Sequence, residues 1–224
     1  MASKKGRERT DMKRKIAIFD FDGVAADSAP FYCERYGMVA KMFNKPYPVK
    51  SMDDFRKWYD SAWENNYRNL GFSDEEIREA VKVVRRKESY SDVPIFPGFK
   101  EAMKTIASRH LTAIASCTAL KVIERKLVEE EMDGDFAFIS GGDGHGSDKR
   151  EIVRAALDHF SIRPEDAVMI GDTEMDVRSA AACGIRAIGT AYGWNTPERL
   201  IKAGAKSIAY KPSDLPDLID EMLA

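Results

Sequence analysis

The residues whose types and spacing could support chemistry are four aspartates that follow apolar runs of the chain. Asp20 and Asp22 end the first run, in the string FDFDGV, and Asp172 and Asp176 follow a later one. If Asp20, Asp172 and Asp176 converge, each close pair repels by about 4 kcal/mol at ~4 Å under an effective dielectric of ~20, so a cation is required among them. Carboxylate oxygens suit Mg²⁺, which keeps several waters and commonly joins carboxylates to a substrate phosphate. The aspartates therefore indicate a magnesium site that handles phosphate.

Two further polar residues stand at comparable places in the sequence. Ser116 follows the apolar run AIA, and Lys149 precedes an amphipathic stretch. A lysine and Mg²⁺ directed at one point would bind a phosphoryl group. The transfer of such a group is catalysed mainly by positioning and electrostatic stabilisation. Taken singly, an aspartate after a strand is more often a turn residue or a helix cap. Only the combination favours a catalytic site.

The elements that must position these residues alternate along the chain. Short apolar runs predict strands at residues 15–20, 111–116, 136–140, 167–170, 185–189 and 207–209. Helical spacing predicts helices at residues 99–109, 120–131, 149–160, 175–183, 197–203 and 215–223. This alternation argues for an open, mostly parallel sheet covered by helices on both faces, a Rossmann-like three-layer α/β core. The ligand of such a sheet lies beyond the carboxyl ends of its strands, where the polar residues stand.

The interval between the first strand and residue 94 breaks the alternation. Residues 29–93 show helical patterning without a convincing strand, and they contain most of the aromatic residues of the chain. We expect a small inserted helical domain whose bulky side chains chiefly fill its own core. The predicted domains are a basic flexible tail at 1–14, a core at 15–28 and 94–224, and the helical insertion at 29–93.

Composition limits the classes of partner. The 224 residues are 44% hydrophobic, which is enough to bury a core, and the formal net charge of -2 gives no global attraction to nucleic acid or a membrane. We expect a small phosphorylated metabolite as partner, while monomer and homodimer both stay open. The cysteines lack metal-binding or disulfide spacing, and no apolar run reaches the ~20 residues that span a bilayer. A cytoplasmic location is the simplest expectation.

The N-terminal tail is the one feature that suggests nucleic acid. Residues 1–15 hold seven basic side chains against Glu8 and Asp11. No aromatic residue is interleaved among them to stack on bases, so a solvated and partly disordered tail is the preferred interpretation.

The motifs taken together resemble a known superfamily. The string FDFDGVAADS at residues 19–28, followed by VMIGDTEMD at 168–176, is similar to the haloacid dehalogenase-like hydrolases, and especially to their phosphoglycolate phosphatase-like and β-phosphoglucomutase-like branches. The strings PG at 97–98 and DVRSAAACG at 176–184 extend the resemblance over nearly the whole chain after the tail. It implies that the insertion is a helical cap, which closes over the active site from linkers near residues 27–30 and 93–98 and carries specificity.

The resemblance also implies a role for each aspartate. Asp20 matches the nucleophile, and Asp22 matches the general acid/base that protonates the leaving oxygen and later activates water. The dehalogenases of the superfamily lack this second aspartate, so Asp22 favours phosphate chemistry. Asp172 matches the carboxylate that binds Mg²⁺ together with Asp20 and the backbone carbonyl of Asp22. Asp176 is expected behind it, either binding a metal-bound water or orienting Lys149.

The remaining matches concern the phosphoryl group. Ser116 matches the Ser/Thr that hydrogen-bonds this group, with Thr118 as the alternative, and Cys117 is included among the phosphate contacts. Lys149 resembles the lysine that holds the nucleophile and the phosphate together. The family often has proline directly after that lysine, whereas this chain has Arg150, which leaves the local backbone open.

Four other residues complete the set of candidates. Gly23 is expected because the chain must turn sharply there, with its backbone amide facing phosphate oxygens. Glu174 is a weaker candidate for the supporting carboxylate. His145 and His159 belong to a residue type that titrates near neutrality, but they fall in a glycine-rich loop and a helix, so structural or solvated roles are expected for both.

These matches predict a Mg²⁺-dependent phosphatase that hydrolyses a small phosphate monoester, phosphoglycolate-like or sugar-phosphate-like, through an aspartyl-phosphate intermediate. A phosphomutase of the β-phosphoglucomutase type uses the same intermediate and is the nearest alternative. Phosphonoacetaldehyde hydrolase would need a Schiff-base lysine in the insertion, for which Lys41 or Lys45 could be proposed. A non-catalytic binding protein of the same fold is the alternative from another class, and the presence of both the nucleophile and the metal carboxylate argues against it.

Overall fold

The computed structural model describes residues 15–86, 90–142 and 148–224. The predicted basic tail, the greater part of the glycine-rich loop and His145 lie outside these residues, so the expectations for them stay predictions. Within the described ranges, none of the helices combines the length and the apolar character that a membrane crossing needs.

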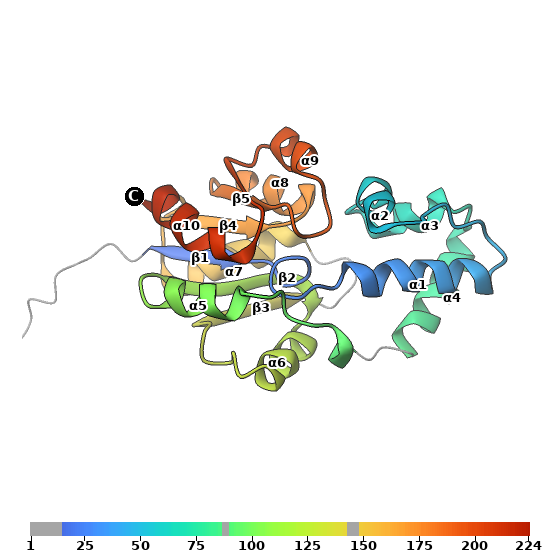
Figure 1. Ribbon diagram of the computed structural model, residues 1–224, viewed down its shortest axis with the longest axis horizontal. Helices are drawn as coiled ribbons and strands as arrows, with labels where there is room; N and C mark the ends of the chain where they lie inside the picture. The colour runs from blue at the N-terminus through green and yellow to red at the C-terminus, as the bar shows by residue number, and fades with distance from the viewer. Residues whose placement is uncertain (1–14, 87–89, 143–147) are drawn as a thin grey trace, which may run out of the picture.

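Six parallel strands form the sheet at the centre of the larger lobe in Figure 1. Their spatial order is β3-β2-β1-β4-β5-β6, which is the doubly wound order of dinucleotide-binding folds. The strands are β1 (Ile16–Phe19), β2 (Leu111–Ala119), β3 (Phe138–Gly142), β4 (Ala167–Gly171), β5 (Arg186–Thr190) and β6 (Ser207–Ala209). In register, Phe19 lies between Ile114 of β2 and Ile170 of β4. The predicted α/β fold with a parallel sheet is confirmed.

Helices cover both faces of this sheet because each central strand is buried on both sides. In β1, Ala17 and Phe19 face one apolar cluster, while Ile16 and Ile18 face the other. The first cluster includes α5 (Phe99–Ala107), α6 (Leu120–Glu129) and α10 (Leu215–Leu223), and the second includes α7 (Lys149–Phe160), α8 (Glu174–Ala182) and α9 (Pro197–Ala203). Short 3₁₀ turns precede β4 and α10, namely η2 (Pro164–Asp166) and η3 (Pro212–Asp214). An unbroken apolar strand is what a doubly covered parallel sheet requires.

The inserted residues form the smaller, separate lobe at the right of Figure 1. Its helices are α1 (Ala29–Met42), α2 (Met52–Trp58), α3 (Trp63–Asn69) and α4 (Asp74–Arg86). The 3₁₀ turn η1 (Tyr90–Asp92) comes after this lobe, in the linker that leads back to the larger lobe, where it contacts α6. Aromatic side chains, among them Tyr36, Phe55 and Tyr67, make up a large part of the smaller lobe's own core. Trp194, which follows β5 in the larger lobe, is buried in that same cluster. We call the insertion the cap and the larger lobe the core domain.

Two predicted strand ends differ from the structure near the site. Strand β2 continues past the predicted end at residue 116 to Ala119, with a register shift against β3 between Ser116 and Ala119. Strand β3 includes Gly141 and Gly142, which the sequence pattern assigned to a surface loop. Glycine is a weak strand residue, and here pairing with β2 outweighs that local preference.

Candidate active site

The candidate site lies at the carboxyl ends of β1 and β4, the two strands at which the connections of the sheet reverse direction. Asp20 directly follows β1, and its backbone N–H donates to the Ile170 carbonyl of β4 at 2.9 Å. Asp172 directly follows β4. Both residues are nearly inaccessible to solvent, and a carboxylate oxygen of each lies within 4.8 Å of the other and of Asp176. The doubly wound fold therefore supplies the convergence that the sequence predicted.

Lys149 joins two of these aspartates. Its Nζ lies 2.8 Å from Asp20 Oδ1 and 2.9 Å from Asp176 Oδ1, and its side chain is buried. The lysine is the first residue of α7, and the preceding Asp148 caps the helix by accepting the Arg150 N–H. Arg150 also pairs with Asp148 at the surface, so its side chain is solvated.

Asp176 has a local task in addition to its contact with Lys149. Thr173 caps α8, and Asp176 Oδ2 accepts both the Thr173 N–H at 3.0 Å and its hydroxyl at 2.6 Å. This reciprocal arrangement is a capping box, which satisfies donors that a helix start leaves unpaired. One oxygen of Asp176 thus faces its own helix and the other faces the lysine. Of the two supporting roles that the sequence left open, the geometry favours orienting Lys149.

Burial and crowding of like charges leave the site short of positive charge. Burial, with the Asp176 carboxylate nearby, raises the pKa of Asp20 to about 7 in spite of Lys149. Burial and the neighbouring Asp176 and Asp20 carboxylates hold the pKa of Asp172 well above its usual range. Burial opposes the charges of Lys149 and Asp176 as well, but their mutual attraction outweighs it, so the lysine pKa rises and the Asp176 pKa falls. A further cation would relieve the remaining repulsion.

The donor set fits a hard divalent cation. Asp172 Oδ2 accepts the Trp194 backbone N–H at 2.8 Å, while its other oxygen, Oδ1, is buried and has no hydrogen-bond partner. A buried carboxylate oxygen without a partner is costly, and coordination of a metal ion is one way to satisfy it. Oxygen atoms of Asp20 and Asp172 are the ligands that Mg²⁺ prefers. The residues present thus fit the ion that the sequence analysis expected.

Asp22 is directed away from this carboxylate cluster. Its Oδ1 accepts the Tyr90 hydroxyl at 2.6 Å, and its Oδ2 accepts the Thr118 hydroxyl. Thr118 belongs to β2, and Tyr90 belongs to the segment that leads from the cap back to the core domain. Both elements therefore hold the side chain of Asp22. This orientation leaves only the backbone of Asp22 for the metal contact that the sequence analysis assigned to it.

The two hydroxyl residues at the end of β2 have different neighbours. Ser116 is buried, hydrogen-bonds to Asp20, and accepts the Thr118 N–H on its Oγ at 3.2 Å. Thr118 instead contacts Asp22, so Ser116 is the better placed of the pair for a phosphoryl group on Asp20. Cys117 lines the same cavity, and burial raises the pKa of its thiol to about 11. It would therefore act there as a neutral thiol.

The prediction for Gly23 agrees with the structure on the turn and differs from it on the amide. Its backbone N–H donates to the Ala26 carbonyl at 2.8 Å, so it could face a phosphate only if that bond were broken. Glycine is required here for the turn and for a close approach to Asp172. The residue has φ +71°, and a Cβ there would lie 1.9 Å from Asp172 Oδ2. Gly193 makes a similar close approach, because a Cβ there would lie 2.4 Å from the Asp172 Cβ. The backbone packs against the Asp172 side chain at both positions.

Several other candidates lie away from the chemistry. His159 stacks on Phe138, with ring centroids 4.4 Å apart, which agrees with a structural role. Glu174 accepts from Arg199 Nε at 3.2 Å, so it is engaged outside the carboxylate cluster. Lys45 pairs with Glu76 at 2.9 Å, and neither Lys45 nor Lys41 is among the residues that line the cavity.

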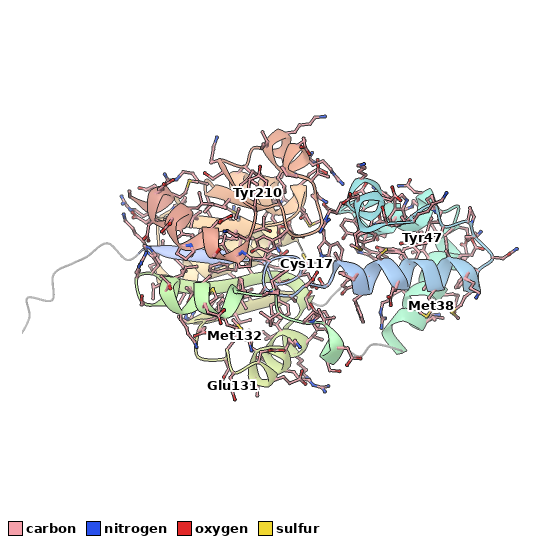
Figure 2. The ribbon with its side chains drawn as sticks, viewed as in Figure 1. Met38, Tyr47, Cys117, Glu131, Met132 and Tyr210 are labelled. Carbon is pink, nitrogen blue, oxygen red and sulfur yellow. The ribbon has the colours of Figure 1, made fainter. Side chains whose placement is uncertain are left out.

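A cavity of about 970 Å³ opens over these residues between the core domain and the cap. Cys117, at the end of β2, is labelled in Figure 2 where the two lobes meet. Tyr32, Arg35 and Trp63 line the cap side, and Lys121 and Arg125 of α6 line part of the core side. The cavity is therefore polar and charged around the aspartates and rich in aromatic residues toward the cap.

Sequence reasoning missed the residues that join the cap to the site. Trp194 follows β5 and Tyr90 follows the cap, and neither belongs to a run that signals chemistry. The position of Trp194 just after a strand could have marked it, by the same rule that marked Asp172. Tyr90 carried no comparable signal.

Comparison with known proteins agrees with this geometry. The family model described as haloacid dehalogenase-like hydrolase matches residues 17–190. A phosphorylated carbohydrates phosphatase of Thermotoga maritima is 26% identical over 93% of this chain and 100% of the relative, and a phosphoglycolate phosphatase of Synechococcus elongatus is 24% identical over 92% and 97%. A haloacid dehalogenase-like hydrolase from Streptococcus pneumoniae superposes with a TM-score of 0.81 at 22% identity, over 92% of this chain and 98% of that one. The chain belongs to the haloacid dehalogenase-like hydrolases, and its enzyme class is that of the phosphoric monoester hydrolases.

Proposed function

We propose that this protein hydrolyses a small phosphorylated carbohydrate or a similar phosphate monoester by way of an aspartyl-phosphate at Asp20, with Mg²⁺ as its cofactor. The observation that carries the proposal is the pairing of buried Asp20 with Lys149 at 2.8 Å beside the unpartnered oxygen of Asp172. This arrangement offers a nucleophile, a fixed cation and a position for a second cation at one point. Phosphoryl transfer depends mainly on such positioning and charge.

Asp20 and Asp172, with the backbone carbonyl of Asp22, would hold the metal ion. When bound, the ion supplies positive charge that neutralises the carboxylates and the oxygens of the phosphoryl group. Lys149, whose Nζ contacts Asp20 Oδ1, would supply the second positive charge, and Asp176 would fix the direction of its ammonium group. Ser116 would hydrogen-bond an oxygen of the transferring group.

In the first step, an oxygen of the Asp20 carboxylate would attack phosphorus in line with the ester oxygen. The bond from phosphorus to that oxygen breaks, and the proton of Asp22 passes to the departing alcohol. In the second step, a water oxygen attacks the phosphorus of the aspartyl-phosphate and gives its proton to Asp22. The carboxylate of Asp20 then leaves, so inorganic phosphate is released and both aspartates return to their starting states.

The substrate class rests on the similarity to a phosphorylated carbohydrates phosphatase and on the cavity. The hydroxyl groups of a sugar would hydrogen-bond to the polar and charged residues near the aspartates. The aromatic side chains of the cap would pack on the apolar faces of the sugar. Residues of the cap that line the cavity, such as Tyr32, Arg35 and Trp63, would choose among esters. The cap would also exclude bulk water during the first step.

The test is phosphate release from a panel of sugar phosphates and phosphoglycolate, with and without Mg²⁺, for the native chain, Asp20→Asn and a control variant, Asp133→Asn. Asp133 is exposed and lies outside the cavity. We expect Mg²⁺-dependent release by the native chain and the control, and a loss of at least ~10³-fold in Asp20→Asn, as for removal of a covalent nucleophile.

Acid quenching during turnover should also leave a phosphoryl group on the peptide that contains Asp20, detected by mass spectrometry. Full activity of Asp20→Asn would contradict the nucleophile. A phosphorylated enzyme that passes its phosphoryl group to a sugar and not to water would identify a phosphomutase instead.

A further inference from the structure

Tyr90 reaches the proposed acid/base from the linker that leads from the cap back to the core domain. Its hydroxyl donates to Asp22 Oδ1 at 2.6 Å. The ring stacks on Phe21, with centroids 6.1 Å apart and planes 28° apart, and its edge meets Phe31 of α1. Neighbours from the core domain and from the cap thus fix the ring, and the hydroxyl is left with little freedom to leave Asp22.

The other linker contacts the same hydroxyl. Ser28, fully buried at the start of the cap, hydrogen-bonds to the Tyr90 oxygen, and its Oγ accepts the Trp194 ring N–H at 3.3 Å. Trp194 donates its backbone N–H to Asp172 and packs its ring among the aromatic side chains of the cap. A continuous set of hydrogen bonds therefore runs from Trp194 through Ser28 and Tyr90 to Asp22.

We propose that Tyr90 is a positioning residue for Asp22, which aims the acid/base at the leaving oxygen only while the two linkers hold the geometry seen here. The inference rests on the proposed function. Thr118 holds the other carboxylate oxygen. Each carboxylate oxygen has a second lone pair, so Asp22 can still carry a proton while both hydroxyls donate to it. Two donors from different elements restrict the carboxylate to one orientation.

This role predicts a dependence on the leaving group. An alkyl phosphate releases an alkoxide oxygen that must receive the Asp22 proton as its bond to phosphorus breaks. A 2,4-dinitrophenyl phosphate releases a stable phenolate that needs no proton at that moment. A misplaced Asp22 should therefore slow phosphoryl transfer from the first ester and spare transfer from the second. The ratio kcat/KM reports this step for both esters, because it includes nothing after the first irreversible step.

The experiment compares kcat/KM on an alkyl sugar phosphate and on 2,4-dinitrophenyl phosphate for the native chain, Tyr90→Phe and Ser28→Ala. Tyr47→Phe is the matched control, because the Tyr47 hydroxyl also bonds within the cap, to the Cys33 carbonyl at 2.8 Å, but does not line the cavity. Figure 2 labels Tyr47 within the cap. Thermal unfolding of each variant checks that it remains folded.

We expect Tyr90→Phe to lose on the order of tenfold in kcat/KM on the alkyl ester, a part of the ~10²–10⁴-fold that general acid–base catalysis contributes. On the dinitrophenyl ester it should stay within about twofold of the native chain, and slow hydrolysis of the intermediate should then appear as a burst of dinitrophenolate. Ser28→Ala should show a smaller loss of the same kind, and Tyr47→Phe none.

Equal losses on both esters, or no loss on either, would overturn the positioning role. If the native chain shows no Mg²⁺-dependent turnover of either ester, the proposed function is overturned instead. Failure of the positioning role and failure of the proposed function are therefore distinguishable. If Tyr90→Phe unfolds, the comparison of Ser28→Ala with Tyr47→Phe decides the question by the same criterion.

Discussion

The two carboxylate oxygens of Asp172 differ in their hydrogen bonding. One accepts a backbone N–H from Trp194, and the other is buried without a partner. An ionised carboxylate in that condition is destabilised, which is why its pKa lies well above the usual range. The pKa of the neighbouring Asp20 is raised to about 7 for the same principal reason, which is burial. At the scale of single residues, burial therefore favours the protonated form of both carboxyl groups, and a bound cation would oppose that preference.

The stability of the metal-free protein should fall with rising pH on this account. The pKa of Asp20 is raised above its ordinary value of 3.8, so the folded state binds more protons than the unfolded chain between 3.8 and about 7. Stability then decreases as pH rises through that window, since stability rises with pH only where the unfolded state binds more protons. Mg²⁺ replaces these protons, so its stabilising effect should be small at about pH 5 and large at about pH 8.

The measurement is the shift of Tm on adding Mg²⁺ at both pH values. Asp172→Asn serves as the comparison, because it removes a carboxylate that the ion would use, and it should abolish most of the shift. A Tm shift that is equal at the two pH values, or that persists in the variant, would contradict this account of the carboxylates.

At the scale of elements, helix starts position the supporting charges. Helix α7 begins at Lys149 and helix α8 begins at Glu174, and each start brings one member of the Lys149 and Asp176 pair to the site. Asp176 takes part in both tasks, because it completes the capping box of α8 and contacts Lys149. Capping and catalysis should be separable, because Thr173 takes part in the first only.

Thr173→Ala should lower stability by about 1 kcal/mol through loss of the N-cap hydroxyl, while most of the activity remains. Asp176→Asn should keep more of the stability and lose ~10–100-fold in activity, because the charge that directs Lys149 is removed. Denaturant unfolding and steady-state kinetics of both variants provide the check. The assignment of Asp176 to Lys149 is wrong if the two variants lose activity equally.

At the scale of the whole molecule, one arginine spans the junction between the lobes. Arg199 of α9 donates to the backbone carbonyls of Arg56 at 3.0 Å and Tyr59 at 2.8 Å, both at the end of α2 in the cap. It also donates to Glu174 in the core domain. A single guanidinium thus connects three chain segments, which its fork of five donors allows.

Arg199→Met should loosen the cap without unfolding the core domain. Amide hydrogen exchange in α2 is expected to accelerate by about one order of magnitude, because carbonyls that lose a charged donor weaken that region by ~1–3 kcal/mol. Exchange in β1 and β4 should be unchanged. Arg163→Met is the matched control, since Arg163 pairs only with nearby surface residues in the contacts described. Uniform acceleration throughout the chain would contradict a local role for Arg199.

The fold class, the strands that carry the site and the acidic residues near it could all be predicted from the sequence. Apolar runs that end at Asp20 and Asp172 suffice for this, because the doubly wound order brings the carboxyl ends of neighbouring parallel strands to one edge. The sequence also indicated the insertion, whose helical pattern interrupts the alternation. These features depend on local periodicity, which a single chain displays directly.

Only the tertiary structure decided which side chains touch. It separated Ser116 from Thr118, assigned the Gly23 amide to a turn, and brought Tyr90 to Asp22 across 68 positions of sequence. Such contacts depend on how the cap packs on the core domain, and no local pattern encodes the distance between two residues far apart in the chain. Residue types were therefore enough to predict which acidic groups meet, whereas the contacts between the cap and these groups required the packed molecule.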